Sequence, residues 1–297
     1  MKKLANLRVN LHVDGGPSLG IGHLTRMHAL KEEISRLGAT VSLSGESLFS
    51  SNLSGPTSSS PSRPEVAVID LPYPADQLIL EYQEKGVPTV VLDHLGKTVP
   101  DVTISVDSKF PNQRGAMHYS GLRYSIVRKS LNKQDLQTGG YALVSIGGSD
   151  LLEQSNVAAE RLINIGASCI VVRGPAASEV RNPPISNVQY LRNPENFDAL
   201  FAKSKFVVIN GGTTLLEALH LGKSIFVLPQ TKGEESFAQR MAQRGLVLGV
   251  GLQSVRQPSP RERLWARLVG PVAVDSKGAS RIARIIFGEA QKYSFSI

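Results

Sequence analysis

Residues 7–26 read LRVNLHVDGGPSLGIGHLTR, and this stretch decides the fold. A strand-like run over Leu7–Val13 leads into a glycine-rich turn, and a helical pattern follows the turn. Gly20 and Gly22 let the backbone approach a ligand closely, and the helix after them offers free N–H groups. His23 stands where the helix begins, beside amides that favour anions. The stretch therefore predicts a site for a phosphorylated ligand with a titratable group next to it.

Three side chains around this turn are candidates for catalysis. His23 suits general-base chemistry near neutral pH, although a histidine at a helix start is also commonly structural. Asp14 stands at the C-terminal end of the strand, and Arg26 lies one turn into the helix. Ligands of α/β proteins bind at the carboxyl ends of parallel strands, which favours a shared site for these three residues. Asp14 alone would fit a turn or capping residue equally well.

The composition is that of a globular protein long enough for two domains. The 297 residues are 41% hydrophobic and 20% charged. We find no run of about 18 apolar residues, and Arg8 and Asn10 interrupt any signal-peptide core. Cys169 is the only cysteine, so no internal disulfide can form, and its apolar surroundings predict a buried strand. We therefore expect a cytoplasmic protein without stable membrane insertion.

The formal net charge of +8 fits a solvated basic surface, an anionic substrate or nucleic acid. The basic residues are scattered and form no dense run with interleaved aromatics. This pattern favours the solvated surface first and the anionic substrate second, and we expect no nucleic-acid partner. The sequence also holds no clustered His, Cys and Asp ligand set, so we expect neither a metal nor a cofactor.

Strand-like and helix-like segments alternate along the chain, which is typical of an α/β protein with parallel sheets built from βαβ units. The predicted strands are Leu7–Val13, Val66–Asp70, Thr89–Asp93, Val102–Val106, Tyr141–Ile146, Ser168–Val172, Val188–Leu191, Phe206–Asn210 and Ser224–Leu228. The predicted helices are Met27–Leu37, Asp76–Lys85, Leu152–Ile165, Glu195–Lys203, Thr214–Leu221, Glu235–Arg244 and Gly278–Tyr293.

A polar segment divides this alternation into two domains. Asn132–Gly140 has the composition of a linker. We therefore expect an N-terminal Rossmann-like domain at residues 1–136 and a C-terminal nucleotide-binding domain at residues 137–297. The terminal helix could pack back across the junction. Ser47–Pro64 is rich in Ser, Pro and Gly and is interpreted as a surface loop.

A second glycine turn, Gly147-Gly148-Ser149-Asp150, joins an apolar strand to a predicted helix. The amides around Gly148 and the hydroxyl of Ser149 could bind an anion there. The alternative is a helix N-cap formed by Ser149 or Asp150, and the sequence leaves both interpretations open.

A third turn follows the next buried strand and reads Asn210-Gly211-Gly212-Thr213-Thr214-Leu215-Leu216-Glu217. The amides from Gly212 to Leu215 would form a nest that suits a diphosphate. Glu217 lies one turn into the helix, where a carboxylate could accept hydrogen bonds from ribose hydroxyls. The alternative is a capping box between Thr214 and Glu217. Three glycine turns at strand ends together favour a nucleotide ligand.

At these motifs the sequence resembles a known family, the UDP-2,4-diacetamido-2,4,6-trideoxy-β-L-altropyranose hydrolases of the pseudaminic acid pathway, with the related spore-coat polysaccharide proteins. The Gly-x-Gly-His-x-x-Arg pattern that ends at Arg26 looks like their first motif. The turns at Gly148 and Gly212, with Glu217, look like the nucleotide-binding half of that family and of the glycosyltransferases that add N-acetylglucosamine to lipid I. The resemblance extends to about Leu246.

The resemblance implies a GT-B architecture, in which two Rossmann-like domains face a cleft, and a small-molecule UDP-sugar as the substrate. It implies that Glu217 holds the ribose, that the amides of Gly212 to Leu215 hold the diphosphate, and that backbone from Tyr190 to Arg192 meets uracil. It further implies that His23 activates water as general base and that the sugar C1–O bond breaks with inversion. Tyr73 resembles a family tyrosine at the substrate pocket.

Two positions depart from the family pattern. The family's first strand usually ends Arg-x-Asp, whereas this one ends His12-Val13-Asp14. An Asn-Gln pair expected after Leu228-Pro229, near the sugar and the catalytic water, is replaced by Gly233-Glu234-Glu235. Three functions therefore stay open. They are a nucleotide-sugar hydrolase of nonulosonic-acid or surface-polysaccharide biosynthesis, a GT-B glycosyltransferase with a sugar or lipid acceptor, and a non-catalytic nucleotide-sugar-binding protein.

Overall fold

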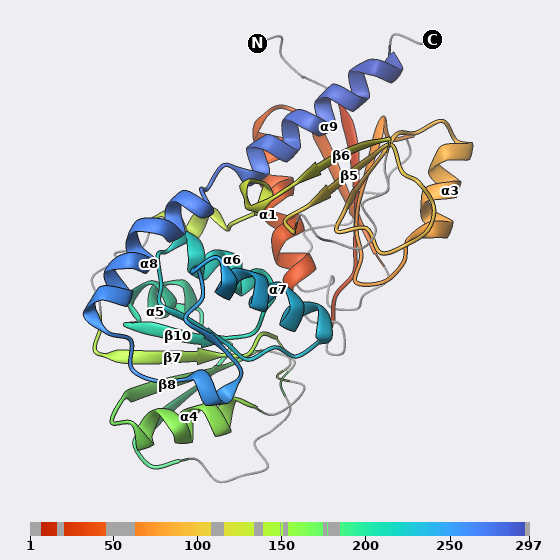
Figure 1. The fold of residues 1–297 in the computed structure, drawn as a ribbon. Coiled ribbons are helices and arrows are strands. Elements are labelled where there is room, and N and C mark those ends of the chain that lie inside the picture. The colour runs from red at the N-terminus through yellow and green to blue at the C-terminus, as the bar shows by residue number, and fades with distance from the viewer. Residues whose placement is uncertain are drawn as a thin grey trace. The chain divides into compact units, whose positions relative to one another are not determined.

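The computed structural model describes residues 7–16, 21–45, 63–107, 116–133, 139–148, 150, 154–174, 177 and 185–294. The chain divides into two compact units (Figure 1). Unit 1 comprises residues 1–19, 23–126 and 276–297, and unit 2 comprises residues 20–22 and 127–275. The sequence places the boundary at residue 136, whereas the structure groups 127–136 with unit 2 and the C-terminal residues with unit 1. Most of the Ser47–Pro64 loop lies outside the described residues.

Unit 1 contains a parallel sheet with the described strand order β2-β1-β3-β4-β5-β6. Its elements are β1 (Arg8–Val13), α1 (Gly22–Arg36), β2 (Thr40–Ser44), β3 (Val66–Asp70), α3 (Asp76–Glu84), β4 (Thr89–Leu92), β5 (Val102–Ser105), β6 (Met117–Ser120), the 3-10 helix η1 (Leu122–Tyr124) and α9 (Gly278–Ser294). The strands predicted at β1, β3, β4 and β5 are confirmed. The prediction missed β2 and β6, because these edge strands have no fully buried residue and so carry little apolar signal.

Helices cover both faces of this sheet because β3 is apolar on both sides. Val66 and Val68 join the core cluster that α1 and α9 share, whereas Ala67 and Ile69 pack in the cluster that includes α3. This alternation follows the two-residue period of a strand. Ile282 and its neighbours on α9 are fully buried in the first cluster, so the last helix completes the core of unit 1.

Unit 2 repeats this plan with the described strand order β12-β11-β10-β7-β8-β9, again all parallel. Its elements are the 3-10 helix η2 (Lys129–Lys133), β7 (Tyr141–Ser145), α4 (Gln154–Asn164), β8 (Ser168–Arg173), β9 (Val188–Arg192), α5 (Phe197–Lys203), β10 (Phe206–Ile209), α6 (Thr213–His220), β11 (Ile225–Val227), α7 (Lys232–Gln243), β12 (Gly249–Val250), the 3-10 helix η3 (Leu252–Ser254) and α8 (Pro260–Ala273). The prediction missed β12 and α8. The capping box between Ser259 and Glu262 was an unused start signal for α8.

The register brings the residues that follow neighbouring strands together at one edge of each sheet. In unit 1, Val13 at the end of β1 pairs with Asp70 at the end of β3. In unit 2, Ser145 at the end of β7 pairs with Ile209 at the end of β10. The residues after these strands therefore share the carboxyl edge of each sheet, where α/β proteins bind ligands. Among the helices of the described ranges, none combines the length and apolar character needed to cross a membrane.

Candidate active site

A histidine–aspartate pair occupies the carboxyl edge of the sheet in unit 1. His23 lies in the first turn of α1, and its Nδ1 is 2.7 Å from Oδ1 of Asp70, the last residue of β3. The Asp70 side chain is fully buried, whereas 26% of the His23 side chain is exposed. A contact this short requires a proton on Nδ1, because two lone pairs would repel each other. In the neutral ring, Nε2 is therefore free of a proton and can accept one.

Arg26 fixes the charge of Asp70. Its Nε and Nη2 both donate to the Asp70 carboxylate, and its Nη1 is 2.7 Å from Oδ2 of Asp93. Burial works to raise the pKa of Asp70, but the charges of Arg26 and His23 outweigh burial and hold this pKa well below its usual range. Burial likewise works to lower the pKa of Arg26, and the two carboxylates raise it instead. Asp70 is therefore an anion throughout the physiological pH range.

The sequence prediction did not include Asp93 or give Asp70 a role. Asp93 follows β4 directly, and its φ of 47° places it in the left-handed region that non-glycine residues rarely adopt. Such backbone strain gathers at functional sites. A usable signal was present in the sequence, because Asp14, Asp70 and Asp93 each end or follow a strand of the same parallel sheet.

Asp14 forms a second pair at this edge with Tyr73. The Tyr73 hydroxyl donates to Oδ2 of Asp14 at 2.9 Å, and Oδ1 of Asp14 accepts the Gly15 amide at 2.8 Å. Asp14 is buried, whereas Tyr73 is 39% exposed. The structure thus gathers His23, Arg26, Asp14 and Tyr73 at the ends of adjacent strands, with Asp14 bonded to the tyrosine. Gly20 lies outside the described residues, and Gly22 begins α1.

In unit 2, the third glycine turn presents an uncapped helix N-terminus. Gly212 is the N-cap of α6, and no described side chain caps this helix. Thr213 and Thr214 are partly exposed, whereas Leu215 is buried. The Leu215 amide donates to the Gly212 carbonyl at 3.0 Å, so the N–H groups that the first turn of α6 offers to an anion are those of Thr213 and Thr214.

Glu217 is buried in the same helix and is bound to Arg128, which the sequence prediction missed. Nε of Arg128 donates to Oε1 of Glu217 at 2.6 Å and Nη2 to Oε2 at 2.9 Å, while Nη1 lies 2.7 Å from Asp198. Burial works to lower the pKa of Arg128, and the two carboxylates raise it. The capping-box alternative for Thr214 is wrong, because Gly212 is the N-cap and the Glu217 carboxylate engages Arg128.

Glu234 supports the third turn through two hydrogen bonds. Its Oε1 accepts from Nδ2 of Asn210 at 2.8 Å, and its Oε2 accepts from the backbone N–H of Gln230 at 2.7 Å. A Cβ atom added to Gly211 would lie 2.7 Å from Cβ of Glu234, so only glycine fits at that position without movement. Glu234 belongs to the segment that replaces the Asn-Gln pair of the resembling family, and its carboxylate holds the loop in place.

At the second glycine turn, the side chain of Asp150 binds backbone amides. The Asp150 carboxylate accepts the amides of Gln154 and Ser155 at 2.9 and 3.2 Å, so it occupies the donors at the start of α4. Residues 151–153, which join Asp150 to α4, lie outside the described residues, so the N-cap alternative stays a prediction. Gly148 is described at this turn, whereas Ser149 lies outside the described residues. Arg192 is exposed at the end of β9 and donates to the Ala177 carbonyl at 3.1 Å.

Within the described ranges, no group of three or more His, Cys, Asp or Glu residues could hold a metal ion. Cys169 is buried in β8, and burial raises the pKa of its thiol to about 12. A thiol with so high a pKa is protonated at neutral pH and makes a poor nucleophile. His23 is therefore the candidate general base at the carboxyl edge of the sheet in unit 1.

Comparison with known proteins identifies the fold. The sequence matches no protein-family model and no curated protein. The glycosyltransferase of kitacinnamycin is 13% identical, with a TM-score of 0.65 over 96% of this chain and 99% of that one. The calicheamicin glycosyltransferase CalG4 is 14% identical, with a TM-score of 0.64 over 97% and 98%. A putative UDP-N-acetylglucosamine 2-epimerase from Listeria monocytogenes is 12% identical, with a TM-score of 0.61 over 97% and 98%. Together with the two parallel sheets, these likenesses confirm the predicted GT-B-like fold class.

Proposed function

We propose that this chain is an enzyme that acts on a nucleotide-sugar, with His23 as its general base. The carrying observation is the 2.7 Å contact between His23 and a buried Asp70 that Arg26 keeps ionised. A histidine oriented by a carboxylate, with its second nitrogen free, is a recurrent catalytic arrangement. The structural neighbours support a nucleotide-sugar substrate through their names, since two are glycosyltransferases and one is a putative UDP-N-acetylglucosamine 2-epimerase.

The proposed reaction is a displacement at the anomeric carbon of the sugar. Nε2 of His23 removes a proton from an attacking hydroxyl, and the oxygen of that hydroxyl forms a bond to C1. The bond between C1 and the diphosphate oxygen breaks, and its electron pair leaves with the nucleotide. The uncapped amides at the start of α6 would stabilise the charge that develops on the diphosphate. Asp70 holds the imidazolium that forms and keeps its proton on Nδ1.

Water as the attacking group makes the protein a hydrolase that releases UDP and free sugar, in keeping with the family resemblance. A sugar or lipid hydroxyl makes it a glycosyltransferase, a second candidate that the names of two structural neighbours favour. Both candidates use the same base. A protein that only binds nucleotide-sugars would have no use for an ionised aspartate that orients a histidine.

The test is turnover without an acceptor. Purified protein is incubated with UDP- and CMP-linked sugars, and free nucleotide is measured alongside melting temperature. For a hydrolase, His23→Ala lowers turnover by about 10²–10⁴-fold and leaves nucleotide-dependent stabilisation intact. His28→Ala, on the same helix, is the matched control and keeps full activity. Binding without turnover shifts the assignment to transfer. Wild-type turnover in His23→Ala, or no stabilisation by any nucleotide, overturns the proposal.

A further inference from the structure

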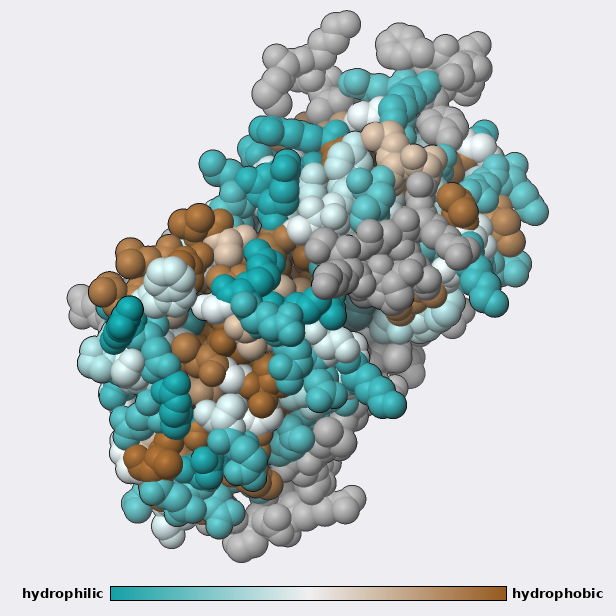
Figure 2. All heavy atoms as spheres, in the orientation of Figure 1, coloured by the Kyte–Doolittle hydropathy of each residue, from teal (hydrophilic) through white to brown (hydrophobic). Residues whose placement is uncertain are grey.

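Helix α8 presents an apolar row to solvent. Leu264, Trp265, Leu268 and Val272 are 59%, 53%, 61% and 84% exposed, and their spacing puts them on one face of the helix. Figure 2 shows brown, hydrophobic atoms gathered over the part of the surface where Figure 1 draws α8. Large apolar side chains exposed together mark a surface that meets a partner.

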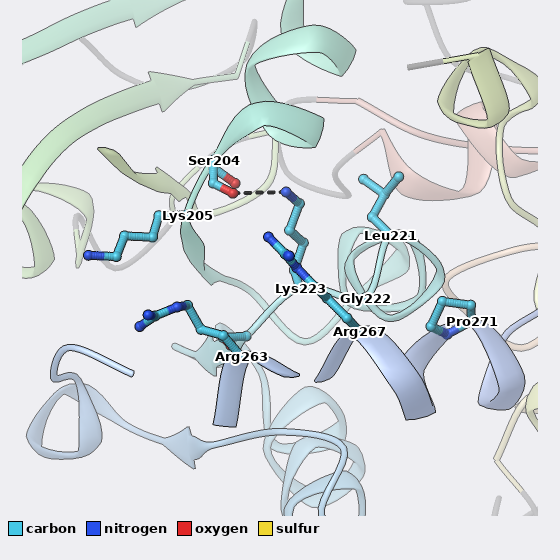
Figure 3. Close-up of a pocket in the computed structure, with 9 residues that line it drawn as sticks. Ser204, Lys205, Leu221, Gly222, Lys223, Arg263, Arg267 and Pro271 are labelled. Atoms are coloured by element: carbon cyan, nitrogen blue, oxygen red, sulfur yellow. Dashed lines mark hydrogen bonds between the residues drawn. The ribbon is translucent and has the colours of Figure 1, made fainter. Parts of the chain in front are cut away.

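A cationic pocket lies beside this row. Its cavity of about 280 Å³ is lined by nine residues, of which four are cationic and none is acidic (Figure 3). The cations are Lys205, Lys223, Arg263 and Arg267. Four positive charges around one cavity favour an anionic ligand.

The wall of the pocket is buried and polar. Nζ of Lys223 donates to the carbonyls of Ala202 and Ser204, which leaves one of its three donors for a ligand. The hydroxyl of Ser224 is buried and has no hydrogen-bond partner among the described residues. Burial, and then the charge of Arg267, lower the pKa of Lys223 to about 8, so a bound anion would relieve an unfavourable charge.

The pocket and the apolar row occupy neighbouring strips of α8. Arg263, Arg267 and Pro271 follow one another at four-residue spacing and line the pocket. Leu264, Leu268 and Val272 each follow these residues by one position. Because a helix turns about 100° per residue, the apolar strip runs alongside the cationic one. A single flat surface could therefore meet both strips at once.

We propose that α8 docks the protein on a membrane surface that contains anionic phospholipid, with a headgroup phosphate in the pocket and the apolar row at the acyl boundary. Tryptophan and leucine on one face with arginine beside them are the features of an interfacial helix. The formal charge of +8 complements such a surface. This role is independent of the proposed function, because the pocket lies at the amino ends of β10 and β11, away from the strand ends that carry the glycine turns.

Vesicle sedimentation tests this docking. Wild-type protein should sediment with phosphatidylcholine vesicles that contain phosphatidylglycerol, should remain in solution with pure phosphatidylcholine, and should release at high salt. Arg267→Glu should lower the partition coefficient by about 10- to 30-fold, and Leu268→Ser by about fivefold. The controls Arg284→Glu on α9 and Leu80→Ser on α3 make the same changes at exposed positions of unit 1. Melting temperatures confirm that each variant folds.

Four results would overturn the proposal. One is the absence of sedimentation with anionic vesicles, and another is an equal loss in the control variants. A third is stabilisation by inorganic phosphate without vesicle binding, which would make the pocket a site for a free anion. The fourth is a dimer that Leu268→Ser dissociates in sedimentation velocity, without vesicle binding, which would assign the apolar row to a second copy of this chain.

Discussion

The carboxyl edges of the two sheets share a topology and differ in chemistry. In unit 1 the candidate site consists of side chains, because hydrogen bonds join His23, Arg26 and Asp70 in one network. In unit 2 the candidate site consists of backbone amides, and the carboxylates there have structural contacts. Glu217 binds Arg128, and Glu234 accepts a hydrogen bond from Asn210 in the glycine turn. One arrangement suits proton transfer and the other suits holding an anion.

This contrast predicts different sensitivities at the two edges. Unit 1 should lose activity when a side chain keeps its shape and changes its charge, because its chemistry depends on protonation. Unit 2 should respond to a single added methyl group, because the backbone at Gly211 packs closely against Glu234.

The largest effect is expected from Asp70→Asn. An amide that faces Nδ1 no longer fixes the tautomer of His23, so turnover should fall by about 10³–10⁴-fold. Asp93→Asn changes only the second partner of Arg26 and should lower turnover by less than about tenfold. Steady-state kinetics of both variants measure the difference. Equal losses would show that the network acts as a charge cluster, without a specific role for the His23–Asp70 bond.

Acid unfolding checks the same network without a substrate. The folded-state pKa of Asp70 lies below its unfolded value of about 3.9, so the anion stabilises the fold above that pH. This contribution is lost as pH falls toward the folded-state pKa. The difference in unfolding free energy between wild type and Asp70→Asn should shrink as the pH falls below about 4. A difference independent of pH would contradict an ionised Asp70.

The next largest effect is expected at the ion pair of unit 2. Arg128→Met leaves the Glu217 carboxylate buried and unpaired, which should lower the free energy of unfolding by about 3–5 kcal/mol. The double variant Arg128→Met/Glu217→Leu should recover most of that loss, because the buried Glu217 charge is gone and the remaining carboxylate, Asp198, is partly exposed. Denaturant titrations of the three proteins measure both changes. A double variant no more stable than Arg128→Met would show that the pair itself stabilises unit 2.

Much of the fold was predictable because apolar strands alternate with helical patterns. β3, for example, is buried at all five positions and was predicted with its observed bounds. The edge strands β2 and β6 and the two-residue β12 were missed, because their side chains are only partly buried or exposed. Helix α8 was missed because its exposed face is apolar and blurs the amphipathic pattern.

The candidate site was predictable only where its residues lie close together along the sequence. His23 and Arg26 were found because one turn of helix separates them, and the glycine turns because they follow strands. Asp70 and Asp93 reach Arg26 across 44 and 67 residues, and Arg128 reaches Glu217 across 89. Such partners depend on strand order, which one sequence read by itself does not supply.

A smaller effect is expected when a methyl group is added to the glycine turn of unit 2. Gly211→Ala places Cβ against the side chain and backbone of Glu234, so unfolding free energy should fall by about 1–3 kcal/mol and nucleotide affinity should fall with it. Gly233→Ala is the matched control, since its Cβ meets only Oγ1 of Thr231, at 3.8 Å, in the first turn of α7. The free energy of unfolding of this control should rise by about 0.5–1 kcal/mol, because alanine has a higher helix propensity than glycine. Calorimetry with and without UDP measures both. A loss of affinity in both variants would remove the special role of Gly211.

The smallest effect is expected from Tyr73→Phe. This variant tests whether the Asp14–Tyr73 pair acts separately from the His23–Asp70 pair. The variant removes one hydrogen bond to Asp14, which is buried and still accepts the Gly15 amide, so unfolding free energy should fall by about 0.5–1.5 kcal/mol. Asp14 and Tyr73 bond to each other beside the His23–Asp70 pair, so kcat should change by less than about threefold. A rise in KM would then reflect substrate binding by the half-exposed Tyr73 hydroxyl. If kcat instead fell as far as in Asp70→Asn, the two pairs would belong to one catalytic network and the division drawn within unit 1 would fail.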